Sequence, residues 1–126
     1  MATKKVLKIG IMPREQYKKR TIAIAKGEYK PQKNEPKIWF DSVRSMAQVL
    51  SNENQQLLKI IEEHKPSSLK ELEILTGRKR SNLSRTLKTM SRYNIVALEK
   101  HQKTVKPIVK ATDFKVEFGL HSSISG

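Results

Sequence analysis

The residues best suited to chemistry in this sequence gather between positions 78 and 92. Three consecutive basic residues, Arg78, Lys79 and Arg80, precede a segment in which leucine and methionine recur every three or four residues. That spacing predicts an amphipathic helix over residues 81–93, opened by Ser81. The face opposite the apolar stripe is then entirely polar or basic, and consists of Ser81, Asn82, Ser84, Arg85, Lys88, Thr89 and Arg92.

The side chains on this polar face are of the types that can read double-stranded DNA. Short side chains at the start of a helix let its backbone approach the base edges, Arg85 can make two hydrogen bonds to guanine, and Asn82 can make two to adenine. The three basic residues before the helix would contact phosphates, which the helix N-terminus also favours. We therefore expect residues 81–93 to enter the major groove. The competing interpretation is an ordinary solvated helix face.

The charge of the chain supports a polyanionic partner. The 126 residues include 26 Lys and Arg but only 12 Asp and Glu, for a net charge of +14. Nucleic acid is the leading expectation, with an anionic membrane surface or an acidic protein as alternatives. The excess is uneven, because Glu99 is the only acidic residue among ten basic ones between Arg78 and Lys110. A non-specific architectural or RNA-binding protein fits the charge as well.

The neighbouring segments predict the elements that would position this helix. Apolar periodicity and capping residues indicate helices over 41–50, 52–64 and 69–75, the last capped by Ser68 with Glu71 as in a capping box. Two strands follow, Ile95–Glu99 and Val105–Lys110, joined by a polar loop over 100–103. A third strand is expected over 113–120. The result is an α+β fold, mainly α with a small β wing: a winged helix-turn-helix. His101 and Lys103, within the 100–104 wing, would contact the DNA backbone.

The N-terminal segment predicts a separate basic arm. Residues 5–11 are typical of a strand, residues 13–26 of an amphipathic helix bearing Tyr17, Arg20, Thr21 and Ile24, and residues 28–37 of a linker. We therefore divide the chain into an arm over 1–37, a DNA-binding domain over 38–120 and a frayed tail over 121–126.

The arm needs a partner, because a lone strand must pair with its own hairpin or with another chain. An exposed Trp39–Phe40 pair would be costly, so these rings pack on the core or on a second copy. We expect the arm, with Trp39 and Phe40, to form much of a homodimer interface. The alternative is a basic tail that lies along DNA through Lys4, Lys5, Lys8, Lys18, Lys19 and Arg20.

Several classes of protein are not expected. The chain has no cysteine, and its three histidines are far apart, so no metal site is predicted. No triad, glycine-rich loop or isolated carboxylate pair points to an enzyme or a cofactor. There is neither a signal peptide pattern nor an apolar run of about 18 residues, so a membrane span is not expected and a cytoplasmic location is.

The segment Ser68–Leu98, SLKELEILTGRKRSNLSRTLKTMSRYNIVAL, resembles the DNA-binding core of MarR-like and ArsR-like bacterial regulators. The wider chain, including Ile11-Met12-Pro13-Arg14-Glu15 and Trp39-Phe40, resembles small predicted regulators that include the TumA-like antitoxins. The resemblance implies a sequence-specific transcriptional regulator, expected to be a repressor and a homodimer. The alternative that it implies is an antitoxin that binds a toxin encoded beside it and regulates its own operon.

Two residues depart from the pattern of those regulators. Glu73 stands where a small residue is usual, at the approach of the two helices of the motif, so it must turn outward or loosen the crossing. Asn94 stands where glycine is usual. Asparagine tolerates the left-handed backbone conformation that such a position requires.

Overall fold

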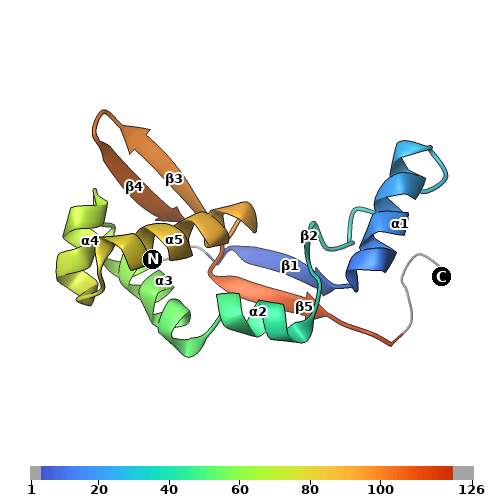
Figure 1. Cartoon of the computed structure of the whole chain (residues 1–126), viewed down its shortest axis with the longest axis horizontal. Coiled ribbons are helices and arrows are strands. Elements are labelled where there is room, and N and C mark those ends of the chain that lie inside the picture. Colours follow the sequence, from blue (N-terminus) through green and yellow to red (C-terminus); the bar gives the residue numbers. More distant parts are fainter. Residues whose placement is uncertain (1–3, 121–126) are drawn as a thin grey trace.

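The computed structural model describes residues 4–120, which form an α+β fold with five helices and two sheets (Figure 1). The predicted tail over 121–126 lies outside the described residues. The helices are α1 (Arg14–Ala25), α2 (Val43–Val49), α3 (Asn52–His64), α4 (Leu69–Thr76) and α5 (Arg80–Arg92). The strands are β1 (Val6–Ile11), β2 (Ile38–Phe40), β3 (Val96–His101), β4 (Thr104–Val109) and β5 (Asp113–Glu117).

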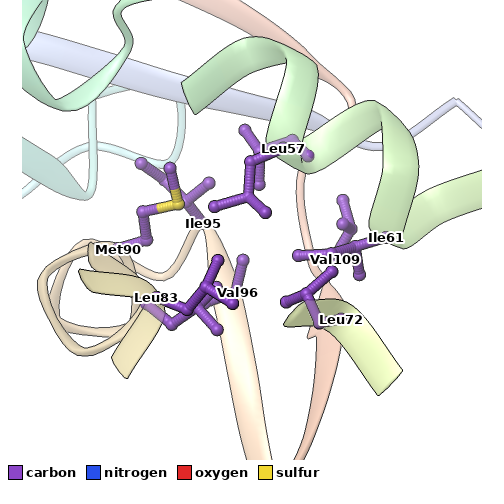
Figure 2. Packing of buried hydrophobic residues seen from close by; sticks show 10 residues of the cluster. Leu57, Ile61, Leu72, Leu83, Met90, Ile95, Val96 and Val109 are labelled. Atoms are coloured by element: carbon purple, nitrogen blue, oxygen red, sulfur yellow. The ribbon is translucent and has the colours of Figure 1, made fainter. Parts of the chain in front are cut away.

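The helices around α5 enclose an apolar core. Leu57 and Ile61 of α3 meet Leu72 of α4 and Leu83, Leu87 and Met90 of α5, and Val96 and Val109 of the hairpin close the cluster (Figure 2). Burial of these side chains is the main stabilising contribution to this half of the fold. We call this set the helical core.

Serine hydroxyls begin three of the helices, and the prediction of Ser68 as one of these caps is confirmed. Ser42, Ser51 and Ser68 each accept a hydrogen bond from the backbone N–H three residues ahead, at 3.0, 3.3 and 3.1 Å. The capping box differs from the expectation, because Glu71 accepts from the backbone N–H and the hydroxyl of Ser67, at 3.0 and 2.9 Å. The carboxylate thus stabilises the residue before the cap.

The ends of the helices also follow local signals. Gly77 ends α4 with φ 73°, and Lys65 ends α3 with φ 46°, immediately before Pro66. Asn94 takes φ 59°, which confirms that asparagine serves in place of glycine after α5.

The hairpin β3–β4 is longer than predicted. His101 pairs with Thr104, so only Gln102 and Lys103 form the turn, and Gln102 has φ 54°. The predicted loop over 100–103 is therefore wrong in its first two residues, which belong to β3. The strand expected over 113–120 ends at Glu117 and joins the other sheet.

That other sheet has three parallel strands in the order β2-β1-β5. In β1, Ile9 lies opposite Ile38 of β2 on one side and Val116 of β5 on the other. The expectation that the first strand pairs with its own hairpin or with another chain is wrong. Helix α1 returns the chain so that β2 pairs in parallel with β1, and Lys5 O accepts hydrogen bonds from the backbone N–H groups of Thr112 and Asp113 at 2.9 and 3.0 Å.

Helix α1 has no apolar face. Its one buried residue is Arg20, while Tyr17 and Thr21 are exposed, so the predicted amphipathic pattern is wrong. The Arg20 guanidinium lies over the rings of Tyr29 and Trp39, 5.7 and 5.0 Å from their centroids, and forms a 3.3 Å ion pair with Glu35. We call these four residues the Arg20 cluster. Because Arg20 is buried there, it is not a surface charge for a DNA-binding tail.

The Trp39–Phe40 pair packs within its own chain. Phe40 is buried and stacks on Tyr93 at the end of α5, with 4.1 Å between ring centroids. Trp39 is half-buried and covers Gly10. Phe40 is therefore not available to the homodimer interface that the sequence predicts there. Within residues 4–120, none of the helices combines the length and the apolarity that crossing a membrane would need.

Candidate nucleic-acid interface

Helix α5 follows α4 after a connection of three residues, Gly77 to Lys79. It begins at Arg80, one residue before the predicted start, and ends at Arg92. Lys79 is at the N-cap position, so Ser81 lies inside the helix and does not cap it. The earlier start is accommodated by Glu73 of α4, whose carboxylate accepts a 3.2 Å hydrogen bond from the backbone N–H of Arg80.

One row of exposed side chains lies opposite the buried stripe of α5. The stripe of Leu83, Leu87 and Met90 has no exposed surface. Because of helical geometry, residues that follow Ser81 at steps of four, three and four positions lie on the side opposite this stripe. The exposed residues at that spacing are Ser81, Arg85, Lys88 and Arg92. This row, which we call the α5 row, provides three positive charges and one hydroxyl.

The remaining predicted residues of α5 flank this row. Asn82 and Thr89 lie on one side of it and the half-buried Ser84 on the other. The Thr89 hydroxyl donates to the Arg85 carbonyl at 3.1 Å and accepts from Arg92 Nη2 at 3.4 Å. Thr89 is therefore held against its own helix rather than directed outward.

The Arg78 side chain joins α3 to α5 instead of projecting into solvent. Its Nε and Nη2 atoms donate to Asn82 Oδ1 at 2.9 and 2.6 Å, and Nη2 also lies 3.3 Å from the Thr86 hydroxyl. Its Nη1 atom lies 3.4 Å from Asn54 Oδ1 on α3. A two-bond contact between Asn82 and adenine therefore requires Asn82 to release Arg78.

Arg80 is also partnered. Glu73 Oε1 lies 3.0 Å from both its Nε and its Nη2 atoms. Of the two outcomes expected for Glu73, the structure has the outward-turned side chain. This carboxylate offsets the charge of Arg80 and occupies part of the α5 N-terminus, where a phosphate would otherwise bind.

The hairpin supplies the other predicted contacts. His101 ends β3 and Lys103 lies in the turn, and both are exposed. His101 Nε2 lies 3.4 Å from Glu99 Oε1. The hairpin extends away from α3 and α5, with its tip beyond the body of the helices (Figure 1). Its tip is therefore open to an extended partner.

A hollow of about 580 Å³ lies between α3 and the start of α5. Four predicted site residues line it: Arg78, Lys79, Ser81 and Asn82. Glu53 and Gln56 of α3 line the opposite side. The sequence does not associate these two residues with the site, because their proximity arises only from the packing of α3 on α5.

Comparison with known proteins finds one match. The model of the HVO_A0114 family covers residues 49–116, from the last residue of α2 into β5. It therefore includes α5 and the hairpin, and leaves out β1, α1 and β2. Searches of curated proteins and of solved structures find no match.

Proposed function

The chain belongs to the HVO_A0114 family, whose model covers more than half of it, and we propose that it is a sequence-specific double-stranded DNA-binding transcriptional regulator acting as a repressor. In this proposal α3, α4, α5 and the β3–β4 hairpin form a winged helix-turn-helix. Helix α5 enters the major groove and the hairpin contacts the backbone. We also propose that the chain is related to the MarR-like and ArsR-like regulators that its sequence resembles.

The α5 row is the observation that carries this proposal. Three exposed cations and a small hydroxyl lie along one side of a helix whose other side is fixed in the helical core. A rigid helix with such a row can hold its side chains at base edges without a large loss of conformational entropy. Arg85, at the centre of this row, is the residue to which we assign base recognition. Lys79, which is exposed at the N-cap, contacts phosphate.

The contacts of Arg78 and Arg80 refine the predicted roles. Arg78 sets the position of α5 relative to α3, because it bonds to Asn54 and Asn82 together. Arg80 braces α5 against α4 through Glu73. We therefore assign these two arginines to positioning, and assign the direct contacts made around α5 to Lys79 and the α5 row.

The test compares a specific fragment with random DNA at one salt concentration. The specific probe is the region upstream of the protein's own gene, narrowed by footprinting. Arg85→Ala should lower the ratio of specific to random affinity by about ten- to a hundredfold, which corresponds to about 1–3 kcal/mol. Lys79→Ala should weaken both affinities alike, since a phosphate contact carries no sequence information.

Arg44→Ala is the matched control, because Arg44 is an exposed arginine of α2 that is not among the proposed DNA contacts. It should leave the ratio unchanged. An unchanged ratio in Arg85→Ala would remove the assignment of base recognition to this face of α5. The antitoxin alternative stays a prediction, tested by co-purification with the product of the neighbouring gene.

A further inference from the structure

Strand β5 lies at the edge of the parallel sheet, and its outer side has no neighbouring strand among residues 4–120. Apolar side chains alternate along this segment and beyond it. Val116 is 44% exposed, Phe118 60% and Leu120 91%. A free edge with apolar side chains is a template for pairing with another chain.

An apolar groove of about 850 Å³ lies beside this edge. Its apolar part is lined by Met46 of α2, Leu50 directly after it, Leu58 of α3, and Phe114 and Val116 of β5. Phe118 and Leu120 of the same chain do not line it. The chain thus has both an apolar groove and nearby apolar side chains that do not fill it.

Strand register indicates how a second copy would bring the two together. In an antiparallel pair of β5 strands centred on Val116, Phe118 of one copy lies opposite Phe114 of the other, and Leu120 lies opposite Thr112. Directly opposed side chains share one face of the sheet. Phe114 and Thr112 both line the groove. The same pairing therefore carries Phe118 and Leu120 of each copy to the groove of the other.

The charges on the opposite face favour the same register. In a strand pair centred on Val116, each Lys115 lies opposite Glu117 of the other copy, which gives two attractive pairs. In a strand pair centred on Lys115 instead, Asp113 would lie opposite Glu117 and repel it. Within residues 4–120, Lys115 forms no ion pair, while Glu117 lies 3.4 Å from Lys8 Nζ of β1. Lys115 is thus the charge that a second copy would neutralise.

We propose that two copies of this chain associate through antiparallel β5 strands centred on Val116. The two three-stranded sheets become one continuous sheet, and each copy fills the apolar groove of its partner with Phe118 and Leu120. This interface replaces the one predicted from the N-terminal arm with Trp39 and Phe40. It does not rest on DNA binding, because the groove, the edge and the charges all lie outside the proposed DNA contacts.

Charge reversal in the full chain tests this arrangement, with oligomeric state measured by sedimentation over a range of protein concentrations. Lys115→Glu gives two acidic positions and Glu117→Lys two basic ones, so each variant alone opposes like charges. Each should raise the dimer dissociation constant about tenfold. An equimolar mixture of the two variants should form a heterodimer, because every opposed pair is then attractive.

Two further variants make the test independent of folding. Phe118→Ala changes a side chain that is largely exposed in the single chain, so it should raise the dissociation constant about tenfold without lowering the melting temperature extrapolated to low concentration. Lys18→Glu, exposed on α1, makes the same charge change elsewhere and should leave dimerisation unchanged.

Two outcomes would overturn the proposal. In the first, the wild-type chain is monomeric throughout the concentration range; a different protein that covers β5 would then be detected as a complex that Phe118→Ala loses. In the second, Lys115→Glu and Phe118→Ala dimerise as the wild type does. A lower dissociation constant in the mixture of Lys115→Glu and Glu117→Lys than in either variant alone supports the proposed register.

Discussion

The helical core contains only apolar side chains, whereas the Arg20 cluster encloses a guanidinium between two aromatic rings and a carboxylate. Leu83, Leu87 and Met90 in the first region are fully buried. In the second, the Arg20 side chain retains 8% exposure and that of Glu35 15%. Arg20 Nε is also buried without a hydrogen-bond partner among residues 4–120. The two regions therefore differ in what their burial requires.

An apolar cluster is stabilised by the apolar surface area that it removes from water, and almost any arrangement of side chains that fills the space achieves this. A buried ion pair has already lost its hydration, so it needs its partner at the correct place. The first region should thus respond to lost volume, and the second to lost charge or geometry. Four changes test this difference.

The largest effect should come from Leu87→Ala. This side chain lies at the centre of the helical core, and its removal leaves a cavity that the packed helices cannot close. The free energy of unfolding should fall by about 4 kcal/mol, measured by urea denaturation. Ile22→Ala is the control on α1, where the side chain is 46% exposed, and it should cost less than about 0.5 kcal/mol. Similar losses in the two variants would contradict the contrast.

Glu35→Gln should have the next largest effect. It leaves the charge of Arg20 buried with no anion to offset it, and we expect a loss of about 3 kcal/mol. The double variant Arg20→Met with Glu35→Gln removes both charges and should recover most of that stability. A double variant as unstable as Glu35→Gln would show that the Arg20 cluster is held by packing rather than by charge.

Gly10→Ala tests the geometry of the same region. A Cβ atom at this position would lie 2.3 Å from the Trp39 ring, which must then move away from β1 and Arg20. The expected cost is about 2 kcal/mol. Trp39 is the only tryptophan in the chain, so its fluorescence spectrum reports the movement directly. Trp39→Val removes the ring that the new Cβ would meet, so Gly10→Ala should cost less in the Trp39→Val background than in the wild type; an equal cost in both backgrounds would contradict a steric origin.

The smallest effect is expected in mild acid. Burial raises the pKa of Glu35, but hydrogen bonds from the Tyr29 hydroxyl and the Gln32 backbone N–H, with the charge of Arg20, outweigh it and hold that pKa below its ordinary value of 4.5. The contribution of Glu35 to stability is therefore complete above pH 4.5 and is lost as the pH falls through the lower folded-state pKa. In Glu35→Gln, the free energy of unfolding, measured by urea denaturation at a series of pH values, should therefore fall less steeply below pH 4.5 than in the wild type.

Glu71→Gln is the comparison from the other region. The backbone N–H and then the hydroxyl of Ser67 lower the pKa of Glu71, so its contribution has the same sign. Glu71 is exposed, and solvent screening should make its effect on the acid limb the smaller one. If Glu71→Gln changed the stability in acid more than Glu35→Gln does, the acid sensitivity would not come mainly from the Arg20 cluster.

The same contrast explains what the sequence could predict. In the helical region the signals are local, since apolar spacing marks the helices and serine, glycine and asparagine mark their ends. The recognition-helix prediction of 81–93 accordingly differs by one residue at each end from Arg80–Arg92. The sheet depends on partners far apart in the chain, and nothing near residues 5–11 reveals that β5 is their neighbour. The place of Arg20 likewise depends on Glu35 and Trp39, which reach it only in the folded chain.

The candidate site follows the same rule. The apolar stripe of α5 determines which side faces outward, so the sequence could predict the α5 row. It could not show that Arg78 and Arg80 are partnered, because Asn54 and Glu73 come from other helices. The glutamate at position 73, which the sequence singled out, does make a contact between α4 and α5, its ion pair with Arg80.

Strand β1 has a consequence for the order of folding during synthesis. The helical region uses contacts among residues 57–109, whereas β1 gains its longer neighbour only when residues 113–117 have left the ribosome. Until then β1 can pair with the three residues of β2 alone, and its other edge stays open. The helices can thus form before the sheet does, and the nascent chain is most prone to aggregation through its N-terminal strand in that interval.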